Sequence, residues 1–184
     1  MCSIYCLTGA QSTGKTTLLE ALKKLDLFRD PYYVSSPTRS FKDKGLKINT
    51  EGDDATQNTI MQYHLDTAKM HIPNRDIILD RCAIDGYVYT KYLHNKGKVS
   101  KECLDKAKAI LNKCLVYYTT IYYIVPEFDV VADGVRDTDK SFRDEVAAIF
   151  DDVIRYAISK GKHVVKLTGS VEDRVATVEE SLNT

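Results

Sequence analysis

Short apolar runs alternate along the chain with longer stretches whose apolar residues recur at helical spacing. The short runs predict five strands, at Ile4–Leu7, Tyr32–Val34, Asp76–Asp80, Thr120–Val125 and His163–Leu167. The longer stretches predict helices at Lys15–Leu27, Ala55–Ile72, Ala83–Leu93, Ser100 to about Val116, Lys140 to about Lys160, and Val171–Leu182. The polar segment 38–54 predicts a loop with no more than one helical turn. This alternation indicates an α/β fold in which right-handed crossovers build a mostly parallel sheet between two helical layers.

Length and composition limit the classes of protein to consider. The 184 residues suit one domain, so we expect residues 1–184 to form a single unit, and 43% hydrophobic with 28% charged residues is a globular composition. The 26 basic and 26 acidic residues cancel, which argues against nucleic acid held by overall basicity but leaves room for a local basic cleft. The apolar runs are strand-sized, so we expect no membrane span.

The cysteines indicate a reducing compartment. The chain has five of them, an odd and scattered set without CxxC pairs or a histidine cluster: Cys2, Cys6, Cys82, Cys103 and Cys114. No basic segment precedes an apolar run at the N-terminus, so no signal peptide is expected. We therefore expect reduced thiols and a cytoplasmic location.

The segment Gly9–Thr16, GAQSTGKT, fits the phosphate-loop pattern G-x-x-x-x-G-K-[ST] without departure, between a predicted strand and a predicted helix. Such a loop aims successive backbone N–H groups at an anion. Lys15 would reach the β- and γ-phosphates, and the Thr16 hydroxyl would ligate Mg²⁺. We expect ATP and Mg²⁺ as cofactors, held by Gly9, Ala10, Gln11, Ser12, Thr13, Gly14, Lys15, Thr16 and Thr17.

Other motifs narrow the kind of phosphate-loop protein. Asn95-Lys96 and Asn112-Lys113 both lack the Asp of the guanine-reading N-K-x-D, and no D-x-x-G occurs, which argues against a regulatory GTPase. Motor-type and AAA-type ATPases usually end a strand in Asp-Glu, where the second acid orients the attacking water. Here the third strand ends in Asp80-Arg81. A guanidinium at that point suits an anionic or hydroxyl-bearing acceptor, so the sequence favours transfer over hydrolysis.

With these motifs in order, nearly the whole chain resembles the small P-loop nucleoside and nucleotide kinases, which include thymidylate kinase, the deoxynucleoside kinases and nicotinamide riboside kinase-like domains. Leu167–Ser170 followed by Glu172–Arg174 resembles their last strand and adenine-side loop, and Asp133–Asp139 with Phe142-Arg143 is most like the riboside kinase-like branch, including phage members. The resemblance implies a three-layer P-loop NTPase fold with strand order 2-3-1-4-5, an acceptor-binding region at about 35–72 and a short lid at about 127–143. Dimers are common among such relatives, so a homodimer stays open.

The resemblance and the strand-end rule together suggest catalytic roles. Asp80 would accept the acceptor's proton or hold Mg²⁺ through water, and the alternative is a helix cap. Arg81 would clamp the acceptor, and the alternative is an ion pair with Asp85. The lid arginines Arg136 and Arg143 would stabilise the transferring group, although Arg143 also suits an ordinary i,i+4 pair. The predicted catalytic residues are therefore Lys15, Asp80, Arg81, Arg136 and Arg143, with Thr16 and Asp80 at the metal.

The acceptor is expected to contact Arg39 and Gln57, together with Asp80 and Arg81. Gln57, Asn58 and Gln62 could hydrogen-bond a base edge or a sugar, and Tyr63, Tyr87 and Tyr89 are the tyrosines best suited to a pocket. His64 and His71 are expected to have packing or surface roles without function.

The sequence therefore predicts an ATP- and Mg²⁺-dependent kinase of a (deoxy)nucleoside monophosphate or a nucleoside. The four arginines Arg39, Arg81, Arg136 and Arg143 tilt the prediction slightly toward a monophosphate, while the riboside kinase-like similarity tilts it the other way. The alternatives are a polynucleotide 5′-kinase, a nicotinamide riboside kinase and a regulatory NTPase module. We expect no membrane partner, and the neutral charge makes nucleic acid an unfavoured one.

Overall fold

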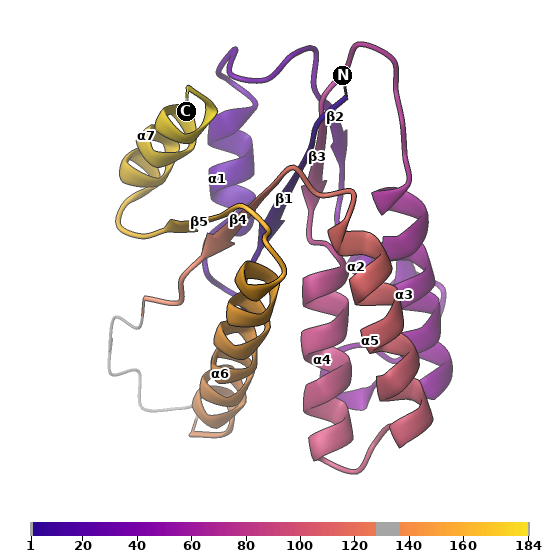
Figure 1. The fold of residues 1–184 in the computed structure, drawn as a ribbon. Helices are drawn as coiled ribbons and strands as arrows, with labels where there is room; N and C mark the ends of the chain where they lie inside the picture. The colour runs from indigo at the N-terminus through magenta and orange to yellow at the C-terminus, as the bar shows by residue number, and fades with distance from the viewer. Residues whose placement is uncertain (1, 128–136, 184) are drawn as a thin grey trace.

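The computed structural model describes residues 2–127 and 137–183, with Thr38, Arg39, Asn49 and residues 137–140 described by their backbone alone. Five parallel strands form one sheet in the order β2-β3-β1-β4-β5. The strands are β1 (Ile4–Thr8), β2 (Tyr32–Val34), β3 (Ile77–Asp80), β4 (Thr120–Ile124) and β5 (Val164–Leu167). The predicted α/β class and strand order are confirmed, and all the strand arrows point toward one end of the sheet (Figure 1).

Helices cover both faces of this sheet, as the three-layer prediction requires (Figure 1). One face packs against α1 (Lys15–Leu22) and α7 (Val171–Leu182), where Leu18, Leu22 and Val178 are buried against strand residues such as Tyr122. The other face packs against α3 (Asp54–Ala68), α4 (Ala83–Asn95), α5 (Lys101–Leu115) and α6 (Asp137–Ser159). Because both faces are covered, the strands are apolar almost throughout.

The boundaries of three helical segments differ from the sequence prediction. Helix α1 ends at Leu22 instead of Leu27, and Leu25 is 41% exposed, so the leucine spacing there does not mark a buried face. The segment 38–54 holds two short helices, α2 (Thr38–Asp43) and a 3₁₀ turn η1 (Asn49–Glu51), which is more helix than predicted. Helix α3 starts one residue early because the Asp53 carboxylate caps it by accepting from the Thr56 N–H.

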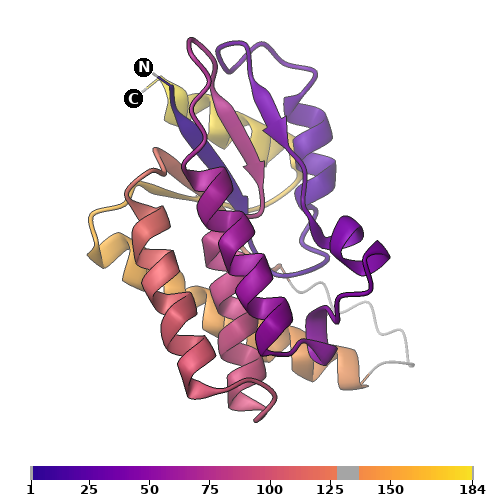
Figure 2. The same cartoon turned by 90° about the vertical axis from the view of Figure 1, so that its right-hand side faces the viewer.

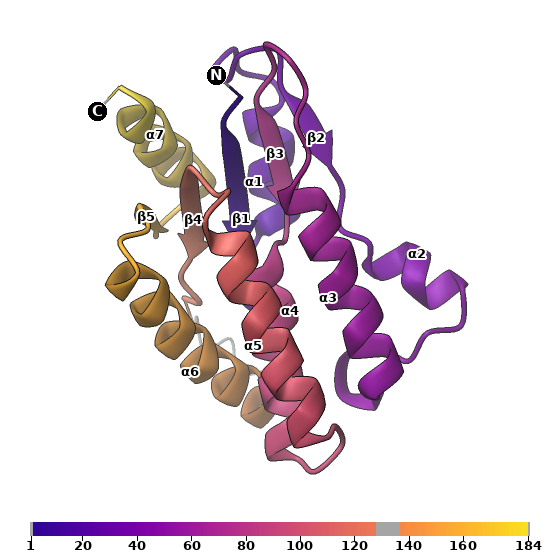
Figure 3. The ribbon, with the colours of Figure 1, turned by 45° about the vertical axis from the view of Figure 1, so that its right-hand side comes forward.

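The sheet register sets the ends of the central strands side by side. Leu7 pairs with Asp80, Thr8 with Tyr123, and Val34 with Leu79, so β1, β2, β3 and β4 finish at nearly the same level. Figures 2 and 3 show α2 beyond the end of β2, set apart from the other helices near this same edge. Residues that follow the strands therefore meet at one edge.

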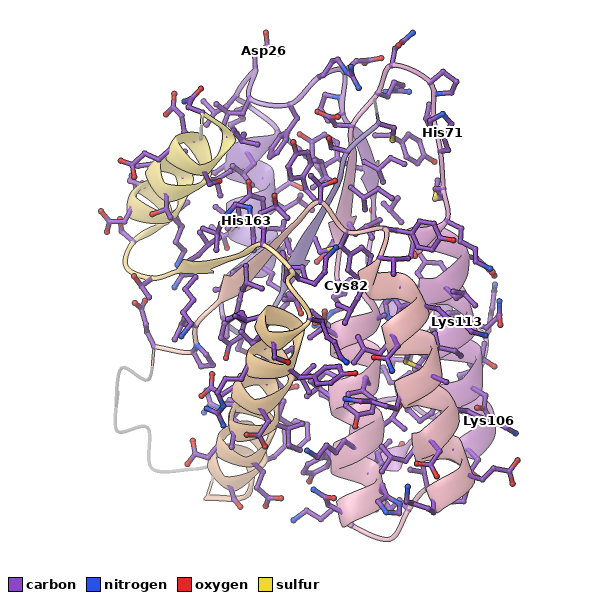
Figure 4. The ribbon with its side chains drawn as sticks, in the orientation of Figure 1. Asp26, His71, Cys82, Lys106, Lys113 and His163 are labelled. Carbon is purple, nitrogen blue, oxygen red and sulfur yellow. The ribbon has the colours of Figure 1, made fainter. Side chains whose placement is uncertain are left out.

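Two further expectations concern the cysteines and membrane-spanning helices. All five cysteines are free, and Cys82, labelled in Figure 4, lies in the interior where the sheet meets α4. Among the described residues, none of the helices combines the length and the apolar character that crossing a membrane requires.

Candidate active site

The loop after β1 has the backbone geometry that the phosphate-loop motif predicts. Gly9, Ser12 and Gly14 have positive φ angles of 147°, 60° and 83°. A Cβ on Gly9 would lie 2.6 Å from the Ile124 carbonyl oxygen, so β4 leaves room for glycine alone. Alternation of left-handed and ordinary conformations turns successive N–H groups to one side, which makes an anion-binding concavity at the start of α1.

Lys15 is the buried charge of this loop. Its ammonium donates to the Gly9 carbonyl at 2.7 Å, to the Ala10 carbonyl, and to the Thr13 hydroxyl at 3.2 Å. Burial, with a smaller effect of the Arg81 charge, lowers the pKa of Lys15 to about 8. The ammonium is thus held on backbone carbonyls at the loop, where an incoming phosphate would offer a stronger partner.

Asp80 is the last residue of β3, the strand next to β1, and Arg81 follows it with an unusual backbone conformation. Arg81 has φ 75°, a left-handed conformation that is rare for a residue with a side chain, and its N–H donates to the Leu7 carbonyl at 3.0 Å. Burial raises the pKa of the Asp80 carboxyl, with the nearby Arg81 charge acting in the opposite direction. The Lys15 charge also acts on this carboxyl, so the structure brings these predicted catalytic groups together.

Asp85 is the site residue that the sequence analysis understated. It is buried, and its carboxylate accepts from the Arg81 guanidinium at 3.2 Å, the Thr8 hydroxyl at 2.7 Å and the Cys82 N–H at 3.0 Å. The i,i+4 spacing from Arg81 was the available signal, and it indicated a solvated pair. The Asp85 carboxylate is instead buried while the Arg81 side chain stays 22% exposed, so Asp85 holds Arg81 in the lining of an adjoining cleft.

That cleft lies between α2, α3 and α4. Its lining is mainly apolar with a few polar groups: Pro37, Phe41, Ile48, Gln57, Ile60, His64, Arg81, Asp85, Gly86 and Tyr89. The predicted acceptor region 35–72 supplies six of these residues, and Gln57 is among them. An apolar cleft with convergent polar groups beside a phosphate loop has the character of a small-molecule site.

His64 lies in the cleft wall, although the sequence analysis gave it no function. The residue is 2% exposed, its Nδ1 has no hydrogen-bond partner among the described residues, and burial lowers its pKa to about 4. A Cβ on Gly86 would lie 2.9 Å from its ring, so glycine at that point in α4 makes room for the imidazole. Helical periodicity placed His64 on α3 but could not show which neighbour its ring faces.

A second concavity, of about 240 Å³, opens beside the phosphate loop. It is lined by loop residues Ala10 to Thr13 together with Pro126, Glu127, Arg143 and Arg174. Arg143 therefore lies on the nucleotide side of the site and not in the apolar cleft. Arg174 belongs to the segment that resembles the adenine-side loop of the small P-loop kinases, but the sequence analysis assigned it no role of its own.

The remaining predicted residues have mixed outcomes. Tyr89 lines the cleft, whereas Tyr63 donates to the Ser35 carbonyl at 3.3 Å and Tyr87 packs with Lys108. Arg39 belongs to α2 by its backbone, and its side chain is outside the description. Arg136, with most of the predicted lid, lies outside the described residues, and the end of that range forms the start of α6.

The donors near the loop fit a magnesium ion that a nucleotide brings with it. Mg²⁺ prefers a few oxygen ligands completed by water and phosphate, and the exposed Thr16 hydroxyl and the half-buried Asp80 carboxylate are oxygen donors of that kind. No cluster of three or more His, Cys, Asp or Glu side chains occurs in the described part of the chain. The residues therefore fit a metal shared with phosphates better than an all-protein site.

Comparison with solved structures places this geometry among known folds. The chain resembles a NadR protein in complex with NR (TM-score 0.70, 18% identity), covering 99% of this chain and 50% of that one. It also resembles deoxyadenosine kinase from M. mycoides (TM-score 0.68, 14% identity, 98% of each chain) and thymidylate kinase from Candida albicans (TM-score 0.63, 14% identity, 99% and 91%). The chain thus spans half the length of the NadR protein, and these likenesses show a fold shared with small P-loop kinases.

No curated protein matches the sequence. A family model described as "AAA domain" matches residues 4–174, from the first strand to the guanidinium beside the phosphate loop. AAA-type ATPases typically end a strand in Asp-Glu, and this chain has Asp80-Arg81 there. The chain therefore matches the family model without this hydrolytic motif. The chain belongs to this AAA-domain family and has the fold of the small P-loop nucleoside and nucleotide kinases.

Proposed function

We propose that this protein is an ATP- and Mg²⁺-dependent phosphotransferase that moves the γ-phosphate of ATP to a nucleoside or a nucleoside monophosphate. The observation that carries the proposal is the position of Asp80 and Arg81. Asp80 ends the strand beside the phosphate-loop strand, the charges of Asp80 and Arg81 both act on the Lys15 ammonium, and Arg81 also lines the apolar cleft. An acid and a guanidinium beside both a phosphate loop and an apolar cleft suit transfer from a triphosphate to an acceptor.

Each side chain has one task in this scheme. Lys15 exchanges its carbonyl partners for phosphate oxygens. Asp80 accepts the proton of an acceptor hydroxyl, and the raised pKa of this half-buried carboxyl makes it a better base than a solvated aspartate. Arg81, fixed by Asp85, binds the acceptor's oxygen next to the transferring group. Bound Mg²⁺ supplies neutralisation of the phosphate charge.

The lining of the cleft favours a nucleoside over a monophosphate. Among the described lining residues, Arg81 supplies the positive charge and Asp85 cancels it, so the cleft offers little to an acceptor phosphate. Arg143, counted toward a monophosphate in the sequence analysis, is on the nucleotide side. Gln57, whose Oε1 accepts from the Thr90 hydroxyl at 3.0 Å, is buried and suits a base edge.

A panel assay tests the proposal. ATP consumption is measured with nucleosides, their 5′-monophosphates and 5′-hydroxyl oligonucleotides, for the unaltered protein and for Asp80→Asn. We expect stimulation by a nucleoside and its loss in Asp80→Asn. Turnover restricted to monophosphates would reverse the acceptor assignment, and acceptor-independent hydrolysis across the whole panel would favour a regulatory NTPase module.

A further inference from the structure

Arg174 joins the C-terminal helix to the phosphate loop. It is 8% exposed, and its Nη1 donates to the Thr13 carbonyl at 2.7 Å. The first turn of α7 is fixed by a capping box in which the Ser170 and Asp173 side chains each accept a hydrogen bond from the other residue's backbone N–H. The backbone at Arg174, the next residue, is therefore held in place. A buried guanidinium on a backbone carbonyl is a strong, directional contact because the donor is charged.

This contact determines where the next backbone N–H points. A trans peptide is planar, so the Thr13 carbonyl and the Gly14 N–H lie on opposite sides of the same peptide unit. The described chain has no cis peptide bond. When Arg174 holds the Thr13 carbonyl, the Gly14 N–H must therefore point away from the guanidinium. The left-handed φ of 83° at Gly14 belongs to the same turn.

Glu127 fixes the guanidinium itself. Its Oε2 accepts from Nη2 of Arg174 at 3.0 Å, and its Oε1 accepts from the Gly169 N–H at 2.6 Å. Glu127 follows β4 and Gly169 follows β5. The Glu127 carboxylate therefore links the ends of these two strands and also pairs with Arg174. Arg174 Nε is buried and has no partner among the described groups. A buried N–H without a partner lowers the stability of the fold. An arginine with that cost indicates that the guanidinium does more than pack.

We propose that Arg174 is a positioning residue of the nucleotide site, which keeps the Gly14 N–H aimed at the phosphates by holding the Thr13 carbonyl, with Glu127 orienting the guanidinium. The inference rests on the proposed nucleotide site and names a determinant of ATP affinity outside the loop motif. It assigns Arg174 no contact with the acceptor, because Arg174 lines the concavity beside the loop and is not among the residues of the apolar cleft.

The test compares Arg174→Met, Arg174→Lys and Glu127→Gln with the unaltered protein. Titration calorimetry with magnesium and a non-hydrolysable ATP analogue gives the nucleotide Kd, and steady-state assays give the KM of the acceptor. We expect Arg174→Met to raise the nucleotide Kd about tenfold, because the Gly14 N–H is no longer held toward the phosphates, with the acceptor KM unchanged. Arg174→Lys should recover only part of this, because an ammonium cannot hold both partners in the fork geometry. Glu127→Gln in the Arg174→Met background should add nothing.

Arg155→Met is the matched control, since Arg155 is exposed and pairs with Asp152 at the surface. Urea unfolding of each variant separates a positioning role from a structural one. Unchanged nucleotide Kd in Arg174→Met and Arg174→Lys, with reduced stability alone, would overturn the inference while leaving the proposed function intact. If Arg174→Met does not fold, the nucleotide Kd values of Arg174→Lys and Glu127→Gln test the inference in its place. Absence of nucleotide binding by the unaltered protein would overturn the proposed function itself.

Discussion

The Asp85 carboxylate lies 3.2 Å from the Arg81 guanidinium, one helical turn away, and it is nearly inaccessible to solvent. The same carboxylate accepts from the Thr8 hydroxyl at the end of β1 and from the Cys82 N–H at the start of α4. It therefore ties the strand that leads into the phosphate loop to the arginine that lines the apolar cleft.

Asp85→Ala should destabilise the protein by about 3–5 kcal/mol, because it leaves the partly buried Arg81 guanidinium, the Thr8 hydroxyl and the Cys82 N–H without their shared acceptor. Urea unfolding at neutral pH measures this. Asp105→Asn is the control, since Asp105 pairs with Lys101 on an exposed face of α5 and should change stability by less than about 1 kcal/mol. An Asp85→Ala variant as stable as this control would show that Arg81 does not depend on Asp85.

Asp80→Asn should bind ATP as the unaltered protein does and lose transfer by about 10²–10⁴-fold, the usual contribution of a positioned general base. Calorimetry gives the affinity and single-turnover quenching gives the rate. The raised pKa of Asp80 adds a pH criterion: the acid limb of the rate in the unaltered protein should lie above the ordinary aspartate value of 3.8. Near-normal transfer by Asp80→Asn would remove this residue from the mechanism.

ATP affinity should fall as the pH rises above about 8. The free protein holds Lys15 with its pKa lowered to about 8 by burial, and only the ammonium form attracts phosphates. Above that pH a proton must be taken up on binding, which weakens affinity by up to about tenfold per pH unit. Calorimetry in buffers of different ionisation enthalpy detects the proton. Constant affinity from pH 7 to 10, without proton uptake, would contradict the assignment.

His64→Met should stabilise the protein in mild acid relative to the unaltered chain. Burial lowers the folded pKa of His64 from 6.5 to about 4, so the unfolded chain binds the extra proton first and stability is lost as the pH falls through that window. Between pH 6.5 and 5 the unaltered protein should lose about 2 kcal/mol more than His64→Met. His71→Met, outside α3 and exposed, serves as the control. Parallel losses in both proteins would show that His64 titrates normally.

The phosphate loop and the strand ends were predictable because their physics is local. The glycine-lined turn between an apolar strand and a helix is one contiguous motif, and the end of β3 at Asp80 is marked in the same local way, by a charge after an apolar run. The boundaries that failed were those decided by tertiary contact. Leucine spacing continued past Leu22, but no layer covers Leu25, and the polar segment 38–54 gained helical turns over the acceptor cleft.

The site residues that were missed depend on long-range contacts. Arg174 reaches Thr13 across 161 positions, and His64 acquires its unusual environment only when α4 packs on α3 through Gly86. Neither contact leaves a period or a motif in the sequence. Asp85 had a visible spacing from Arg81, yet only the structure shows that Thr8 and Cys82 share its carboxylate.

Tracing the γ-phosphate of labelled ATP tests the central claim most directly. The protein is incubated with magnesium, γ-³²P ATP and a mixture of nucleosides, and the products are separated by chromatography. The proposal predicts that the label appears in a nucleoside 5′-monophosphate, that Lys15→Ala abolishes it and that Asp80→Asn abolishes it without loss of ATP binding. Label found only in inorganic phosphate, or left entirely in ATP with every nucleoside and monophosphate tried, would contradict it.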